Sequence, residues 1–169
     1  MKTRLVEVSR ALALSLGALS FVSGVAGAAD PLTDSLARTI VAPFYHALSS
    51  ASGKLVPALV MQSTSPEWIS CRNNDECGPR DKVIDAIAAI HEAIPNLTWE
   101  IKELLVAGNT VIVRGEASGT PNGEFKGVPH GGKSFRVMSI DIHVIEGDKM
   151  KRSYHVEDWL GATRQISAK

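Results

Sequence analysis

The sequence predicts one α+β domain in which helices come first and a curved antiparallel sheet follows. Helical periodicity is confined to the chain before Pro95, and segments rich in Val, Ile and aromatic residues come after it. Tight turns at 108–109 and 146–148 join these later segments in pairs. Helices followed by antiparallel strands are typical of α+β folds, in which the helices cover one face of a bent sheet.

The first helix is predicted over residues 35–48. Apolar side chains recur there every four positions, which is the spacing of one helix face. Asp34 or Ser35 can cap its start, and Pro43 predicts a kink or a break because proline cannot donate to the helical hydrogen bonds. Residues 55–61 predict a short second helix.

The next segment is predicted to be irregular until a third helix begins. Residues 63–79 contain several turn-forming residues and are expected to form a loop. Asp81 then caps a strongly periodic helix that Pro95 ends. Four strands are expected over 97–106, 110–118, 134–146 and 150–158. A glycine-rich crossing over 119–132 joins the second strand to the third, and residues 161–169 are expected to form a short tail.

The first 28 residues have the pattern of a signal peptide. Three basic residues precede an apolar run over 11–25, and small residues follow it. The run is shorter than the roughly 20 apolar residues that span a bilayer, which favours cleavage after Ala28 over a retained membrane anchor. We therefore expect an exported protein, periplasmic or secreted, with a single mature domain over 29–169 and no membrane span after cleavage.

Charge and length restrict the function classes. The chain has 18 basic and 18 acidic residues, and removal of three basic residues and one acidic residue with the leader leaves 15 against 17. No basic stripe is present, which argues against nucleic acid as a partner. The roughly 140 residues that remain suit one domain with one core.

The two cysteines of the chain, Cys71 and Cys77, flank five polar, turn-forming residues. An even number of cysteines in an exported protein favours a disulfide, here one that pins a surface loop. The alternative is a metal pair, but zinc sites favour two-to-four-residue spacing and need further ligands nearby. We therefore expect a disulfide and no metal.

Asp141 and His155 form the candidate catalytic pair. Asp141 lies inside the mostly apolar strand 134–146, and the tight turn at Gly147 makes 150–158 its neighbour. The two side chains then point to one side of the sheet, directly or diagonally opposite each other. A carboxylate beside an imidazole can take a proton from an acidic C–H or O–H group and return it elsewhere. A buried salt bridge that locks the hairpin is the alternative interpretation of the same spacing.

Four further residues are weaker candidates for lining a substrate pocket. They are His143, Tyr154, Arg114 and Asp158. Tyr154 alternates with His155 along its strand, and Asp158, with Glu157, also suits a capping or pairing role at the strand's end. The sequence has no nucleophile elbow, no zinc-protease motif and no phosphate-binding loop that opens a helix.

Five segments in the second half of the chain carry a family pattern. They are GTPxGxFxGVP at 119–129, GKSF at 132–135, SIDIH at 139–143, HVEDW at 155–159 and RQI at 164–166. Their order and spacing resemble the SnoaL-like polyketide (ester) cyclases of the nuclear transport factor 2-like superfamily. The likeness extends over residues 36–166.

The resemblance implies a fold, a chemistry and an assembly. The fold would be a cone-shaped curved antiparallel sheet with N-terminal helices packed on its concave side, paired into homodimers through the sheet. The family's cyclases close a ring by intramolecular aldol addition without cofactor or metal, using a pocket carboxylate as base and a nearby histidine. In those cyclases the histidine lies on the third strand and the aspartate on the fourth. Asp141 and His155 exchange these positions, and we expect Asp141 to be the base and His155 to orient or donate.

Three functions follow as hypotheses. The first is an exported enzyme of cyclase, isomerase or lyase type, which uses Asp141 and His155 without a cofactor on a small apolar carbonyl compound. The alternative is a non-catalytic periplasmic domain of the same fold that binds a small ligand. The third is an interaction module that forms dimers through an exposed sheet face and has a vestigial pocket. Because polyketide cyclisation usually handles cytoplasmic intermediates, export implies that the compound is a different one.

Overall fold

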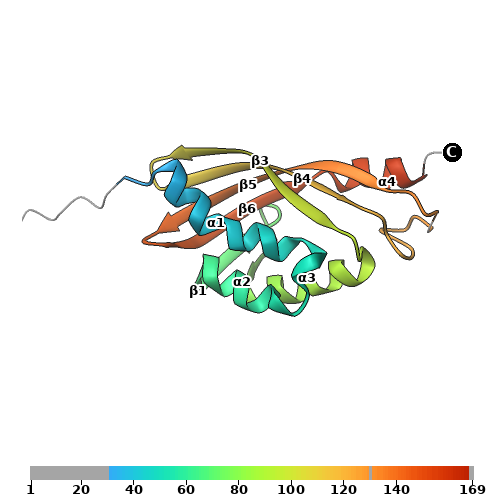
Figure 1. The fold of residues 1–169 in the computed structure, drawn as a ribbon, viewed down its shortest axis with the longest axis horizontal. Helices are drawn as coiled ribbons and strands as arrows, with labels where there is room; N and C mark the ends of the chain where they lie inside the picture. The colour runs from blue at the N-terminus through green and yellow to red at the C-terminus, as the bar shows by residue number, and fades with distance from the viewer. Residues whose placement is uncertain (1–30, 130, 168–169) are drawn as a thin grey trace, which may run out of the picture.

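The computed structural model describes residues 31–129 and 131–167, and it shows a mixed α+β fold (Figure 1). The predicted leader over 1–28 lies outside the described residues. The helices are α1 (Asp34–Leu48), η1 (Ser50–Leu55, a 3-10 helix), α2 (Val56–Ser63), α3 (Arg80–Ala93) and α4 (Trp159–Ser167). The strands are β1 (Thr64–Cys71), β2 (Cys77–Pro79), β3 (Thr98–Ala107), β4 (Thr110–Gly119), β5 (Phe135–Glu146) and β6 (Lys149–Glu157).

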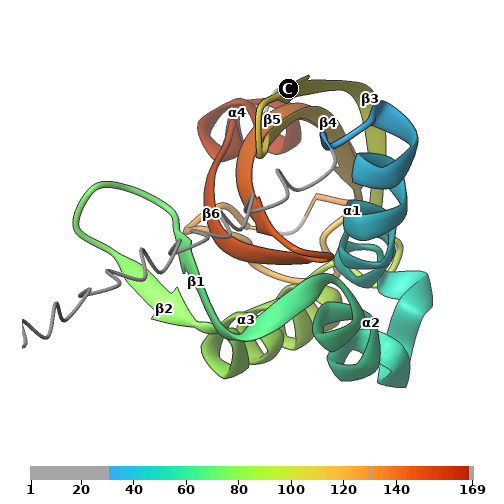
Figure 2. The same cartoon turned by 90° about the vertical axis from the view of Figure 1, so that its left-hand side faces the viewer.

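One bent sheet organises the molecule, with the strand order β2-β1-β6-β5-β4-β3. Strands β3 to β6 form antiparallel neighbours, as the alternation of their sequences predicts. Figure 2 shows these strands as a strongly bent arc, with α1, α2 and α3 gathered on its open side. The predicted α+β class and its helices on the concave side are therefore confirmed.

Two features of α1 differ from expectation. Thr33 caps the helix, because its Oγ1 accepts a hydrogen bond of 3.2 Å from the Leu36 N–H. The predicted caps, Asp34 and Ser35, lie in the first turn of the helix instead. Pro43 predicts a kink or a break, and the helix continues through it, so a break is wrong. The N–H of Phe44 donates to Ser63 Oγ at 3.0 Å, which satisfies a backbone donor beside the proline.

The predicted loop over 63–79 was also wrong, because it contains β1 and β2. β1 pairs with β6 in parallel, so the sheet is mixed and not wholly antiparallel. β1 is fixed by a partner distant in sequence and by Trp68, which is completely buried. Neither effect leaves a local pattern that sequence periodicity can detect.

The predicted tail over 161–169 is a helix instead, α4. The Asp158 carboxylate accepts the Gly161 N–H at 2.7 Å and so caps its first turn. Ala162 and Ile166, four residues apart, are buried and hold the helix on the protein. None of the helices in the described ranges is long and apolar enough to cross a membrane.

Candidate active site

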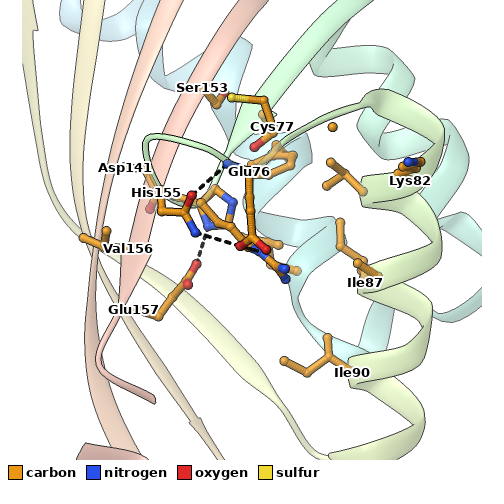
Figure 3. A pocket seen from close by; sticks show the side chains of 18 of the residues that line it. Glu76, Cys77, Lys82, Ile87, Ile90, Asp141, Ser153, His155, Val156 and Glu157 are labelled. Atoms are coloured by element: carbon orange, nitrogen blue, oxygen red, sulfur yellow. Dashed lines mark hydrogen bonds and ion pairs between the residues drawn. The ribbon is translucent and has the colours of Figure 1, made fainter. Parts of the chain in front are cut away.

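A pocket of about 760 Å³ opens between the sheet and α3, a size that suits a small organic ligand. Its sheet wall consists of polar side chains on β5 and β6, among them Asp141, His143, Ser153, His155 and Glu157. Its helical wall consists of Val83, Ala86, Ile87 and Ile90 of α3. Figure 3 shows Asp141, His155 and Glu157 facing Ile87 and Ile90 across the pocket. A ligand would therefore contact polar groups on one side and aliphatic groups on the other.

The polar wall follows from strand alternation in two paired strands. On β5, Ser139, Asp141 and His143 are buried together, because residues two apart share a face. The register pairs these residues, in order, with Glu157, His155 and Ser153 of β6. Three polar pairs thus lie directly opposite one another in an otherwise apolar inner face.

Asp141 is the most deeply buried acid of this wall, with only 3% of its surface exposed. Burial raises its pKa to about 7, against the lowering effect of the Tyr45 hydroxyl, and the negative charge of Glu157 adds to the rise. The Ser139 Oγ donates to Asp141 Oδ2 at 3.4 Å, and Trp99 Nε1 donates to Ser139 Oγ at 3.2 Å. At neutral pH, Asp141 therefore exists as a mixture of acid and carboxylate.

His155 lies directly across from Asp141 but bonds to a different acid. Its Nδ1 is 2.7 Å from Glu157 Oε1, and Trp159 Nε1 donates to Glu157 Oε2 at 3.2 Å. Burial lowers the pKa of His155, but the hydrogen bond and charge of Glu157, with the charge of Asp141, raise it above its ordinary value. Because Glu157 occupies Nδ1, Nε2 is the ring nitrogen left for a ligand.

The other predicted pocket residues are dispersed. His143 lines the pocket and is completely buried. Arg114 and Tyr154 lie on the opposite, exposed face of the sheet, where Arg114 pairs with Glu103 at 3.1 Å. Asp158 caps α4. These three residues do not line the pocket, since strand alternation and the start of α4 direct them away from it.

Sequence reasoning placed Glu157 at the strand's end as a capping or pairing residue. It is the direct partner of His155 and lines the pocket. The signal that could have identified it is its phase: Ser153, His155 and Glu157 alternate on one face of β6. The aromatic side chains of Trp99 and Trp159, which also line the pocket, gave no such signal because they come from separate elements.

The predicted disulfide is confirmed: Cys71 and Cys77 are bonded, at the ends of β1 and β2. It closes a short hairpin whose Arg72, Asn73 and Glu76 line the pocket. Glu76 Oε2 accepts from Arg72 Nε and from Asn73 Nδ2, each at 2.7 Å, which braces the hairpin. The disulfide therefore shapes the pocket and does more than pin a surface loop.

The described residues contain no candidate metal site. Over 31–129 and 131–167, no three His, Cys, Asp or Glu side chains converge as a metal site would require. The pocket wall contains the Asp141 carboxyl, whose pKa is about 7, opposite His155, whose protonated form Glu157 stabilises. Such a pair can accept and donate protons at the same ligand.

A comparison with protein-family models identifies the family of the chain. Residues 61–166 match the model of the SnoaL-like polyketide cyclases, which covers more than half of the chain. The chain belongs to the SnoaL-like polyketide cyclase family. The matched segment contains β1 to β6, α3 and most of α4, and therefore all of the polar wall.

Solved structures share the fold of this SnoaL-like chain. TsrD from Streptomyces laurentii is 24% identical, with a TM-score of 0.68 over 82% of this chain and 99% of its own. A provisionally named SnoaL-like polyketide cyclase from Jannaschia sp. CCS1 is 19% identical, with a TM-score of 0.69 over 80% and 94%. A SnoaL-like polyketide cyclase from Agrobacterium tumefaciens is 19% identical, with a TM-score of 0.59 over 75% and 94%. No curated protein sequence matches the chain.

Proposed function

We propose that this SnoaL-like protein is a cofactor-free acid–base enzyme of cyclase, isomerase or lyase type, acting on a small apolar carbonyl compound. One observation carries the proposal: Asp141 is buried in the pocket wall, its pKa is about 7, and it faces His155. A general base is most effective when its pKa lies near the working pH. An ordinary surface carboxylate, with a pKa near 4, is a much weaker base.

The proposed chemistry assigns one role to each side chain. The Asp141 carboxylate removes a proton from the carbon next to the substrate carbonyl, which leaves an enolate and a protonated Asp141. His155, protonated and paired with Glu157, donates from Nε2 to the enolate oxygen and stabilises its charge. Return of the proton to another carbon gives an isomerase. Bond formation between the enolate carbon and a second carbonyl carbon, whose oxygen takes the proton held by Asp141, gives a cyclase and restores the carboxylate.

The pocket walls support an apolar substrate. Val83, Ala86, Ile87 and Ile90 form an aliphatic surface opposite the acid–base residues. This surface favours a flat hydrocarbon body, while the polar wall fixes the carbonyl group. The low polarity of this surface also strengthens the interaction of His155 with the developing charge.

Proton exchange of a model ketone tests the proposal without knowledge of the natural substrate. We expect the protein to accelerate α-proton exchange of 2-tetralone in D₂O, followed by NMR. Asp141→Asn should reduce the acceleration by about 10²- to 10⁴-fold, the usual contribution of general acid–base catalysis. Asp85→Asn is the matched control, because Asp85 is exposed on α3 and does not line the pocket.

Two results would contradict the enzyme proposal. One is an Asp141→Asn variant that exchanges the ketone as fast as the wild type. The other is a wild type that binds 2-tetralone with no acceleration of exchange, which would favour the alternative function, a non-catalytic ligand-binding domain.

We also propose that the protein is exported and forms a homodimer through the outer face of the sheet. The disulfide is compatible with an oxidising compartment. A cross-strand row of Leu105, Ile112, Ile142 and Tyr154 gives the outer face an apolar strip, most of it exposed. Native mass spectrometry of protein recovered from the periplasm or medium tests both points. We expect a chain that begins at Ala29 and a mass of two subunits. An uncleaved chain would contradict the proposed export, and a mass of one subunit would contradict the proposed homodimer.

A further inference from the structure

Four buried polar side chains form a hydrogen-bonded chain that ends at Tyr45 and has no part in the proton transfer described above. Trp68 Nε1 donates to Ser153 Oγ at 2.9 Å, and Ser153 Oγ lies 2.8 Å from His143 Nδ1. His143 Nε2 lies 3.1 Å from the Tyr45 hydroxyl. The four residues come from β1, β6, β5 and α1, and each is at most 3% exposed. Their hydrogen bonds must therefore be satisfied within the protein.

The direction of these hydrogen bonds depends on the charge of His143. Burial lowers its pKa to about 3, with a smaller lowering from the charge of His155. His143 is therefore neutral at physiological pH, and only one of its ring nitrogens carries a hydrogen. Tyr45 also stays protonated, because burial raises its pKa well above the ordinary value.

The tautomer with the hydrogen on Nδ1 leaves a buried donor without a partner. In this form Nδ1–H donates to Ser153 Oγ, which already accepts from Trp68. The Ser153 hydroxyl hydrogen then has no acceptor among the described residues. Tyr45 must then donate its hydroxyl hydrogen to His143 Nε2, so this hydrogen is no longer available to Asp141. An unpaired buried donor is unfavourable, and so is a buried carboxylate deprived of one.

The tautomer with the hydrogen on Nε2 uses every donor in the chain. Ser153 donates to Nδ1, and Nε2–H donates to the Tyr45 oxygen. The Tyr45 hydrogen is then available to Asp141, whose pKa the Tyr45 hydroxyl lowers. The hydrogen bonds therefore run from Trp68 to Tyr45, and the Tyr45 hydroxyl hydrogen remains available to the catalytic carboxyl.

We propose that His143 is a positioning residue, held by Ser153 as its Nε2–H tautomer so that the Tyr45 hydroxyl donates to Asp141. The tautomer follows from the hydrogen-bond count of a neutral His143 ring. Its importance for catalysis rests on the proposed function, in which Asp141 is the base.

The consequence concerns the protonation of Asp141. Burial and the charge of Glu157 raise the pKa of this carboxyl, while the hydroxyls of Tyr45 and Ser139 and the charge of His155 lower it. The Tyr45 donor thus keeps part of Asp141 ionised at neutral pH, where a base has to act. Tyr45 does not line the pocket, so its effect on a substrate passes through Asp141.

The tautomer can be observed directly in the wild-type protein. Long-range ¹H–¹⁵N NMR at pH 7 on uniformly labelled mature protein distinguishes a protonated ring nitrogen from an unprotonated one. We expect His143 to be protonated on Nε2 and to remain neutral down to about pH 4. A His143 ring protonated on Nδ1 would overturn the proposal.

The coupling to Asp141 is tested by removing one oxygen atom. Tyr45→Phe should raise the Asp141 pKa, measured by ¹³C-carboxyl NMR titration, by about one to two pH units, the usual effect of one hydrogen bond to a charged group. Tyr154→Phe is the matched control, because Tyr154 is on the exposed face of the sheet. An Asp141 pKa that is equal in the two variants would refute the positioning role.

The outcomes separate this proposal from the enzyme proposal. If the tautomer and the pKa change are found but 2-tetralone exchange is not accelerated, the network stands and the proposed function fails. If exchange is accelerated and depends on Asp141 while Tyr45→Phe leaves its pH profile unchanged, the function stands and the positioning role fails.

Discussion

Replacing Asp141 by asparagine should make the protein more stable at pH 8, by up to about 4 kcal/mol in the free energy of unfolding. The folded-state pKa of Asp141 is about 7, roughly three units above its ordinary value, and each unit corresponds to about 1.4 kcal/mol. Below pH 4 the residue is protonated in both states, so its burial carries no charge penalty. The penalty develops between pH 4 and 7 and is complete above pH 7. Asparagine has a similar shape and cannot ionise.

Urea unfolding at pH 4 and pH 8 measures this effect. The difference between Asp141→Asn and the wild type should be small at pH 4 and large at pH 8, whereas Asp85→Asn should differ little from the wild type at both. A difference of equal size at the two pH values would mean that Asp141 carries no buried charge. A stabilised variant that has also lost ketone exchange would show that the catalytic group destabilises its own fold.

Acidification should destabilise the protein through His143, by up to about 5 kcal/mol between pH 6.5 and pH 3. The folded-state pKa of His143 is depressed to about 3, while its unfolded value is near 6.5. Stability from this group is therefore complete above pH 6.5 and is lost as the pH falls toward 3, because the unfolded chain binds a proton that the folded protein cannot. Among the described residues the ring is hydrogen-bonded only to Ser153 and Tyr45, and neither of them carries a negative charge that could compensate its own.

The variant pair His143→Gln and His46→Gln isolates this contribution, with unfolding followed by tryptophan fluorescence. His46 is exposed on α1, so its replacement should leave the pH dependence unchanged. His143→Gln should lose stability less steeply below pH 6.5, whatever its stability at neutral pH. Parallel pH profiles for the two variants would contradict the prediction. In the wild type, Asp141 and His143 change the free energy of unfolding in opposite directions as the pH rises from 4 to 6.5. Removing one of the two groups should therefore expose the pH dependence that the other contributes.

Local patterns were sufficient for the elements whose stability is mostly local. The four predicted strands correspond to β3 to β6 within a residue or two at each end, and the three predicted helices correspond to α1, α2 and α3. Alternation on adjacent strands also placed Asp141 opposite His155, which the register shows. Binary pattern and turn chemistry determine these features, and both can be read from short windows of sequence.

The remaining features depend on contacts between distant segments. β1 forms because Trp68 is buried and β6 pairs beside it, and its own residues include turn formers such as Ser65 and Pro66. Glu157 belongs to the site because it pairs with Ser139 on β5 and accepts a hydrogen bond from Trp159 on α4. Arg114 and Tyr154 were wrongly directed to the pocket because a residue's face depends on the phase of its whole strand.

The parallel pairing of β1 with β6 has a consequence for the order of folding. Ser70 pairs with Ser153, so β1 can join the sheet only after nearly the whole chain is available. The helices and the hairpins of β3 to β6 use nearer partners and can form earlier, since closing a long loop delays non-local pairing. The pocket is then the last part of the molecule to close, because its two walls meet only when β1 and its hairpin dock. A chain held before that step would keep its cysteines apart from the sheet and accessible to oxidants in solution.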